Sequence, residues 1–297
     1  MATAPQAPFD ARLLRLRKRR AAQGFAEAAF LHQRAAEDLA ERLEAIPRRF
    51  ERALVLGAPD LFRAALSKRP ELGTRIGDLS EADVAGEGVE VDFERLPFAP
   101  GAFDLIVSPL VLHWVNDLPG ALIQLRTALK PDGLLLASLF GGETLNELRL
   151  ALLEAESEVR GGAALRVAPF ADLRDLGALL QRAGFALPAA DRDVVTVRYG
   201  EPLRLLSDLR AMGETAALAE RAPPLTRTVL MRALEIYRRR FGDADGRVRA
   251  TFEILTATGW APHASQQQPL KPGSARERLA DALGVQERSA GEKPGEG

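Results

Sequence analysis

The chain of 297 residues contains no cysteine. Disulfide bonds, thiolate metal sites, iron–sulfur ligation and cysteine nucleophiles are therefore excluded. No stretch approaches the roughly 20 apolar residues that a membrane-spanning helix requires. The formal net charge is only -1, so no strong field favours nucleic acid or anionic lipid. These absences predict a globular protein without a transmembrane span and without a nucleic-acid partner.

The composition bears on where the protein works. The first 25 residues are rich in alanine and arginine and poor in acids, as in organelle transit peptides, but no apolar signal-peptide core follows them. Arginine outnumbers lysine by 35 to 5, which is typical of a GC-rich bacterial genome. We therefore favour a cytoplasmic bacterial protein over an organelle protein. A partner could still hold it at the inner face of the membrane.

One large domain is expected over residues 28–275, with a helical insertion at about 201–241. Residues 1–27 form a basic N-terminal extension. Its basic run at 12–20 either grips an acidic partner or membrane surface or forms a solvated helix face, and we favour the second. The polar residues 276–297, with several glycines, predict a disordered tail.

Short apolar runs alternate with helical patterns along the domain. The predicted strands are 53–56, 75–79, 89–91, 103–108, 134–140, 195–199 and 249–258. The predicted helices are 28–46, 61–67, 118–129, 173–180, 203–212 and 225–241. This alternation indicates a doubly wound, Rossmann-like α/β fold with a mostly parallel seven-stranded sheet. We expect the last strand to pair antiparallel with the strand before it.

In such a sheet, ligands bind outside the carboxyl ends of the strands at the point where the strand order reverses. Four segments are expected at this edge, namely 56–61, Asp78, 92–98 and 108–117. A nucleotide-like cofactor needs a tight glycine turn there, a carboxylate for its ribose and apolar walls for its base. We therefore expect a crevice above the first, second and fourth strands.

Two sequence runs are distinctive, Leu-His-Trp-Val-Asn-Asp-Leu-Pro at 112–119 and Phe-Gly-Gly-Glu-Thr-Leu at 140–145. Together with Asp-Phe-Glu-Arg-Leu-Pro-Phe at 92–98 and Phe-Asp-Leu-Ile-Val-Ser at 103–108, they resemble class I methyltransferases that depend on S-adenosyl-L-methionine (SAM). Over roughly residues 9–283 the chain is similar to the mitochondrial complex I assembly-factor branch and its alphaproteobacterial relatives. The malonyl-carrier methyltransferase of the biotin pathway is a cousin.

The resemblance implies a set of cofactor contacts. Asp78 would bind the ribose, Asp92 the adenine, and Ser108 and Leu110 the methionine end of SAM. Gly57 would supply the tight turn after the first strand. Asp78 is equally well explained as a turn residue, whereas the surroundings of Asp92 favour the functional interpretation.

The resemblance also implies that His113, Trp114 and Asn116 face the substrate and carry the catalytic role. His113 would be the base for an acceptor that must lose a proton, although a buried structural histidine is an equal alternative. Trp114 is slightly better explained as a lid on the core. For Asn116 we favour a helix cap, a role that Asp117 could also fill.

The cofactor loop departs from the family pattern of an acidic residue followed by Gly-x-Gly-x-Gly. Of the three glycines only Gly57 is present; Val55 replaces the acid, Pro59 the second glycine and Leu61 the third. Proline lacks an N–H and leucine adds a side chain where the backbone must approach closely, and Asp60 adds a negative charge. Each loss costs on the order of 1–3 kcal/mol, which predicts weakened SAM binding.

Two functions follow. The first is SAM-dependent methyl transfer to a small-molecule or protein acceptor. The alternative is a respiratory complex I assembly factor with a degenerate SAM site, acting by binding or, as the resemblance implies, by protein arginine hydroxylation. Hydroxylation needs a metal or redox cofactor, and His32, His113 and His263 form no recognisable ligand pattern. We therefore predict no metal site and rank methyl transfer first.

Overall fold

The computed structural model describes residues 7–83, 89–267 and 284. Contacts divide the chain into one unit of residues 1–262 and a second of 263–297. The sheet and the helices belong to the first unit, which includes the N-terminal helix that the sequence assigned to an extension. Apart from Gly284, the predicted tail at 276–297 lies outside the described residues.

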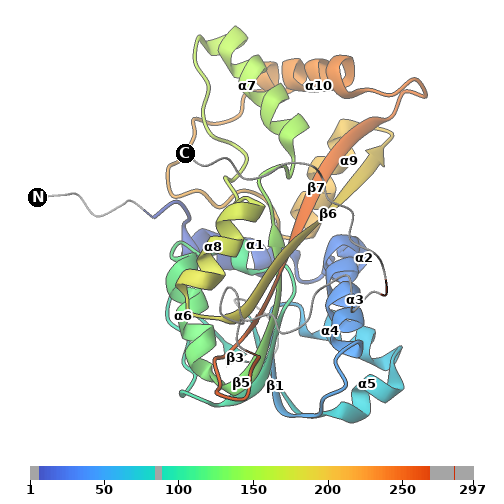
Figure 1. Cartoon of the computed structure of the whole chain (residues 1–297). Coiled ribbons are helices and arrows are strands. Elements are labelled where there is room, and N and C mark those ends of the chain that lie inside the picture. Colours follow the sequence, from blue (N-terminus) through green and yellow to red (C-terminus); the bar gives the residue numbers. More distant parts are fainter. Residues whose placement is uncertain (1–6, 84–88, 268–283, 285–297) are drawn as a thin grey trace, which may run out of the picture. The chain divides into compact units, whose positions relative to one another are not determined.

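Within the first unit, a single mixed sheet carries the fold (Figure 1). Its strands are β1 Phe50–Leu56, β2 Ile76–Asp83, β3 Val89–Glu90, β4 Phe103–Ser108, β5 Leu129–Phe140, β6 Ala186–Tyr199 and β7 Val248–Trp260. They lie in the order β3-β2-β1-β4-β5-β7-β6. Strands β1 to β5 pair in parallel, and β7 runs antiparallel to both β5 and β6. The predicted Rossmann-like class with an antiparallel last strand is confirmed.

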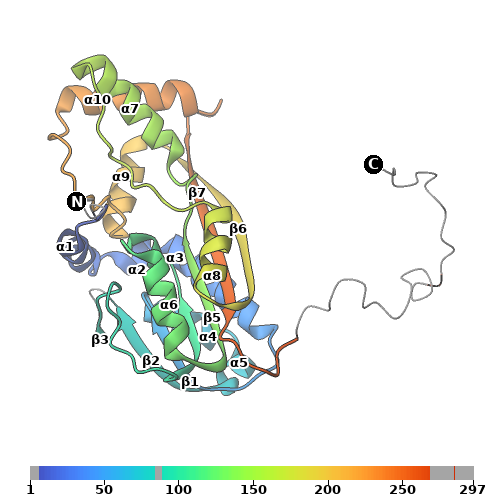
Figure 2. The same ribbon diagram turned by 60° about the vertical axis from the view of Figure 1, so that its left-hand side comes forward.

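Helices cover both faces of the sheet, as Figures 1 and 2 show. They are α1 Ala11–Ala21, α2 Phe25–Ala28, α3 Phe30–Glu44, α4 Pro59–Ser67, α5 Pro70–Arg75, α6 Leu118–Ala128, α7 Asn146–Arg160, α8 Leu173–Arg182, α9 Pro202–Ala211 and α10 Arg227–Phe241, with a short 3-10 turn, η1, at Leu112–Trp114. Helices α6 and α8 pack on one face and α3 and α4 on the other. Helices α9 and α10 stand between β6 and β7 in the sequence, where an insertion was predicted.

Strand β4 is buried at every residue and joins the cores of the two faces. Its Leu105 and Val107 pack in the cluster of α3 and α4, whereas Ile106 packs in the cluster of α6 and α8. Successive strand residues point to opposite faces, so one uninterrupted apolar run serves both layers.

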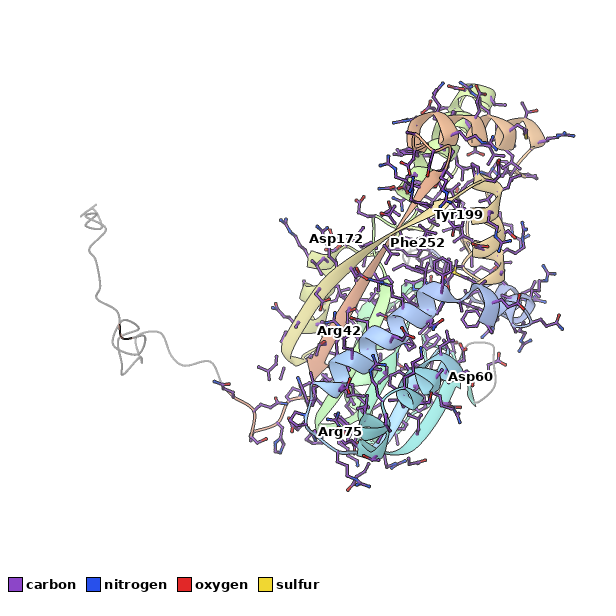
Figure 3. The ribbon with its side chains drawn as sticks, turned by 90° about the vertical axis from the view of Figure 1, so that its right-hand side faces the viewer. Arg42, Asp60, Arg75, Asp172, Tyr199 and Phe252 are labelled. Atoms are coloured by element: carbon purple, nitrogen blue, oxygen red, sulfur yellow. The ribbon has the colours of Figure 1, made fainter. Side chains whose placement is uncertain are left out.

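A third apolar cluster connects the long ends of β6 and β7 to α7, α9 and α10. Phe252 of β7 and Tyr199 of β6 belong to it (Figure 3). The edge strand β6 is also tied to α3 by Arg42, whose guanidinium donates to both carboxylate oxygens of Asp191 at 2.6 and 2.8 Å. A bidentate pair of this kind fixes geometry as well as charge.

Candidate functional site

The turn after β1 is built on Gly57, which has a φ of +80°. Its N–H donates to the carbonyl of Ala82 at 2.9 Å. A Cβ added to Gly57 would lie 2.9 Å from the Cβ of Val111, closer than real Cβ contacts come. Both the backbone conformation and the close approach therefore require glycine at this position.

Ala58 follows with a φ of +44°, and helix α4 begins at the next residue. Pro59 thus occupies the first position of the helix, where its missing N–H would have had no partner inside the helix. The N–H of Leu61 donates to the Ala58 carbonyl at 3.1 Å. Pro59 and Leu61 therefore belong to the first turn of α4, and Asp60 is exposed there (Figure 3).

The expected position of Asp78 is wrong. In the β1–β2 register Asp78 lies opposite Arg52, while Leu56 at the end of β1 lies opposite Ala82. Asp78 is therefore exposed near the beginning of β2, and Asp83 is the residue at the carboxyl end. The sequence misplaced this end because the second half of the strand, Ser-Glu-Ala-Asp, is largely polar.

Ser108 ends β4, and Leu110 follows it closely. Ser108 is fully buried, and its Oγ has no hydrogen-bond partner in the described part of the chain. Leu110 has a φ of +47°, and its N–H donates to the Ser138 carbonyl at 3.0 Å. This arrangement leaves a buried hydroxyl at the carboxyl edge of the sheet, beside a strained turn.

Asp92 lies in the turn between β3 and β4 and is exposed. Its carboxylate accepts the N–H of Glu94 at 3.0 Å. The glycine turn of β1, the carboxylate of β2 and the buried hydroxyl of β4 stand at the ends of adjacent strands. Gly57, Asp83 and Ser108 therefore fit a nucleoside-type cofactor at this edge.

A buried carboxylate, Glu214, connects the segment of His113 and Trp114 to helices α1 and α3. It accepts hydrogen bonds from Lys18 Nζ at 2.5 Å and His32 Nε2 at 3.1 Å. It also contacts His113 Nε2 at 3.0 Å and Trp114 Nε1 at 2.8 Å. The sequence showed Glu214 only as part of a Met-Gly-Glu run. Its partners lie so far away in the chain that spacing could not reveal them.

Burial opposes the charge on Glu214, but Lys18 and His113 outweigh it and hold the pKa of this carboxyl well below its ordinary value. Burial lowers the pKa of both His32 and His113, against the pull of Glu214. Both rings are therefore neutral and donate from Nε2. His113 Nδ1 faces the Phe140 N–H at 3.5 Å, so His113 presents no free ring nitrogen to a substrate.

Asn116 holds the N-terminal segment. Its side chain accepts the N–H of Phe9 at 2.8 Å and donates to the Phe9 carbonyl at 3.3 Å. The helix cap of α6 is Asp117, which accepts the N–H of Gly120 at 2.9 Å. The rings of Phe9 and Trp114 pack edge to face, with their centroids 5.2 Å apart. His113, Trp114 and Asn116 do lie together, and each of them contacts the segments that position α1.

A cavity of about 540 Å³ opens beside Trp114 and Glu214. Leucine is the commonest residue of its lining, with leucines from α1, α7 and α9 and from the loops 161–172 and 213–226. In the described part of the chain, no group of three or more histidine and acidic residues has an arrangement that holds a metal ion. None of the described helices has the length and apolar character needed to cross a membrane.

Residues 73–137 match the family described as a methyltransferase domain. The chain is 40% identical over 261 residues to arginine-hydroxylase NDUFAF5, mitochondrial, of Danio rerio, covering 85% of this chain and 81% of that protein. The Homo sapiens protein of the same name is 39% identical over 255 residues, with coverages of 83% and 74%. Malonyl-[acyl-carrier protein] O-methyltransferase of Halorhodospira halophila is 32% identical over 296 residues, with coverages of 94% and 97%.

This chain is therefore a class I SAM-dependent methyltransferase family protein. Within that family it belongs to the group that includes NDUFAF5 and the malonyl-carrier O-methyltransferases. Among solved structures, the YcgJ protein of Bacillus subtilis superposes with a TM-score of 0.50 at 15% identity, covering 76% of this chain and 98% of that one. That likeness concerns the fold alone.

Proposed function

We propose that this protein binds SAM at the carboxyl edge of β1, β2 and β4 and methylates an acceptor that enters the cavity beside Trp114. The observation that carries the proposal is the convergence of Gly57, Asp83 and Ser108 at the ends of adjacent strands. The family membership supports the same cofactor.

Asp83 takes the ribose role that the resemblance had given to Asp78, because it alone stands at the end of β2. Asp92 and the backbone around Leu110 border the adenine and methionine ends. When bound, SAM supplies a methyl group already activated on a sulfonium. The residues of the chain then need only hold the acceptor in line and exclude water, and the apolar cavity does both.

His113 is a positioning residue in this proposal, because both of its ring nitrogens face polar partners inside the protein. The acceptor is accordingly one that needs no histidine base. With a single glycine in its cofactor loop, the protein is proposed to bind SAM more weakly than a family member that retains all three.

Calorimetric titration with SAM and S-adenosylhomocysteine tests the site. We expect Asp83→Asn to weaken SAM binding at least about tenfold, because a neutral amide is a poorer acceptor for two ribose hydroxyls. Asp78→Asn is the matched control on the same strand and should leave affinity unchanged. The absence of heat and of any melting-temperature shift with either compound at millimolar concentration would refute SAM binding.

A second candidate function is supported by the 40% identity to NDUFAF5. In this alternative the protein assists respiratory complex I assembly, by binding a subunit or by hydroxylating one of its arginines. Affinity purification of the tagged protein, followed by mass spectrometry of co-purified subunits, separates the cases. A gained oxygen on arginine supports hydroxylation, a gained methyl group supports transfer, and no enriched subunit counts against an assembly role. Placement in the bacterial cytoplasm stays a prediction.

A further inference from the structure

The cavity beside Trp114 has apolar walls, and apolar side chains at its mouth are exposed to solvent. Leu148 and Leu152 of α7 and Leu209 of α9 form buried parts of the wall. At the mouth, Leu165 and Leu225 are 49% and 38% exposed. Exposed leucines gathered around a hollow of this size are typical of a surface that an apolar ligand covers.

Two charged side chains of the lining, Glu214 and Arg166, already form ion pairs inside the protein. Glu214 is neutralised by Lys18. Arg166 is paired with Glu156, and its guanidinium also donates to the Pro223 carbonyl at 2.7 Å. Neither group therefore requires a charged ligand.

Two other guanidinium groups of the lining lack such compensation. Arg17 of α1 is half-buried and donates to the carbonyls of Thr215 and Ala216. It makes no ion pair with a described carboxylate, although Asp10 lies near enough to act on it weakly. Burial lowers the pKa of Arg17, although the nearby Asp10 acts in the opposite direction.

Arg221 is exposed at the same lining and likewise makes no ion pair within the described ranges. The exposed Glu220 opposes these two cations. Arg17, Arg221 and Glu220 together therefore leave a net charge of one positive unit beside the apolar wall of the cavity.

We propose that this cavity binds a long single-chain amphiphile with an anionic head, its chain along the leucines of α7 and α9 and its head at Arg17. The inference deepens the proposed function, because such an amphiphile would be the acceptor or would carry it. The shared chemistry is a chain with a carboxylate or phosphate head. A ligand of this class is distinct from a cationic arginine side chain, which the net positive charge at the mouth of the cavity would repel.

Tryptophan fluorescence reports on the cavity directly. The chain has two tryptophans, and Trp260, at the end of β7, pairs with Leu134 of β5 and lies beside Arg48. In a Trp260→Phe protein, Trp114 is the only tryptophan. We expect dodecanoate or dodecyl phosphate, below its micellar concentration, to change this emission saturably. Butyrate and dodecyltrimethylammonium should bind at least about tenfold more weakly, for lack of a chain and of an anion respectively.

Arg17→Gln in the same background should weaken dodecanoate binding about tenfold, since a charge-assisted hydrogen bond is removed. Arg12→Gln is the matched control, because Arg12 is an exposed arginine of the same helix that does not line the cavity. Saturable binding of either anionic probe with this ranking supports the proposal. Equal binding of the cation or of butyrate, an Arg17→Gln protein that matches Arg12→Gln, or no response to either anion overturns it.

Titrations of SAM and of dodecanoate are made separately and together. Dodecanoate binding without SAM binding would count against the proposed methyl transfer alone. SAM binding without dodecanoate binding would count against the amphiphile alone.

Discussion

At the scale of single residues, the carboxyl edge of the sheet depends on positions that tolerate little change. Gly57 has a left-handed backbone conformation, and the side chain of Val111 leaves no room for a Cβ at this position. Ala58 adopts a left-handed conformation without being glycine, a strain of order 1–3 kcal/mol that the surrounding contacts must offset. The turn thus contains two successive left-handed residues, although only one of them is glycine.

Substitution of Gly57 by alanine should destabilise the protein by roughly 2–4 kcal/mol, from the backbone conformation and the clash with Val111. Gly161→Ala separates the two contributions, because Gly161 has a similar φ of +74° with nothing within 4 Å of an added Cβ. That control should lose about 1 kcal/mol. Urea unfolding measures both, and equal losses would show that Val111 plays no part.

The two buried histidines predict a pH dependence of stability. Burial lowers the pKa of His32 and His113 in the fold, while in the unfolded chain each imidazole would protonate near the ordinary histidine pKa of 6.5. Falling pH therefore adds protons to the unfolded chain first, so the free energy of unfolding should decrease as pH drops below about 6.5. The slope should approach about 1.4 kcal/mol per pH unit for each histidine.

Urea unfolding between about pH 8 and pH 5.5 tests this linkage. His32→Gln should roughly halve the slope, whatever it does to stability at neutral pH. At lower pH, Glu214 also makes the free energy of unfolding decrease as pH falls. Its pKa is lower in the fold than in the unfolded chain, so the stabilisation from its charged form is lost as pH falls through that lower pKa. A flat profile through pH 6 would contradict the neutral, buried state of both imidazoles.

At the scale of elements, α1 is the part whose role sequence patterns could least reveal. Its basic run favoured a solvated face, yet Arg17 and Lys18 turn inward to the 214–216 loop. The residue pattern of α1 alone cannot predict these contacts, because the partners of Arg17 and Lys18 are nearly two hundred residues away in the sequence. By contrast, β4 and the α6 stripe were correctly predicted, since a continuous apolar run and a leucine period carry their own signal.

The misplaced boundaries of β2 and β6 share a cause. Strand β2 was cut short at Leu79 and β6 was detected only from Val195, although they run to Asp83 and from Ala186. Both contain many half-exposed or exposed residues, so the apolar alternation is diluted. The position of Asp78 at the carboxyl end of β2 was wrongly predicted for that reason, whereas Gly57 and Ser108 follow strongly patterned strands and do stand at the carboxyl ends of β1 and β4.

Asn116→Ala should release the N-terminal segment, because both hydrogen bonds to the Phe9 backbone are lost. We expect α1 to open more readily by about 1–2 kcal/mol. Hydrogen exchange of residues 10–21 should then accelerate at least about fivefold, with the amides of β4 unchanged. Asp117→Ala, which removes only the α6 cap, should leave exchange in α1 as it was. Identical exchange in both proteins would show that Asn116 does not clamp the segment.

At the scale of the whole molecule, fold and site differ in what a single sequence reveals. The sheet order follows from the alternation of strands and helices, which fixes a right-handed, doubly wound layout. The Glu214 cluster and the apolar cavity instead assemble from α1, η1, α7, α9 and intervening loops. No local sequence pattern encodes the contact between these elements, so the cluster and the cavity became visible only with the structure.

The separation of Lys18 from Glu214 by 196 positions also has a consequence for biosynthesis. A ribosome adding roughly 5–20 residues per second needs roughly ten to forty seconds between these two codons. Throughout that interval the nascent α1 emerges with its inward cation lacking its anion. The contact between Lys18 and Glu214 can therefore form only after most of the chain has been synthesised.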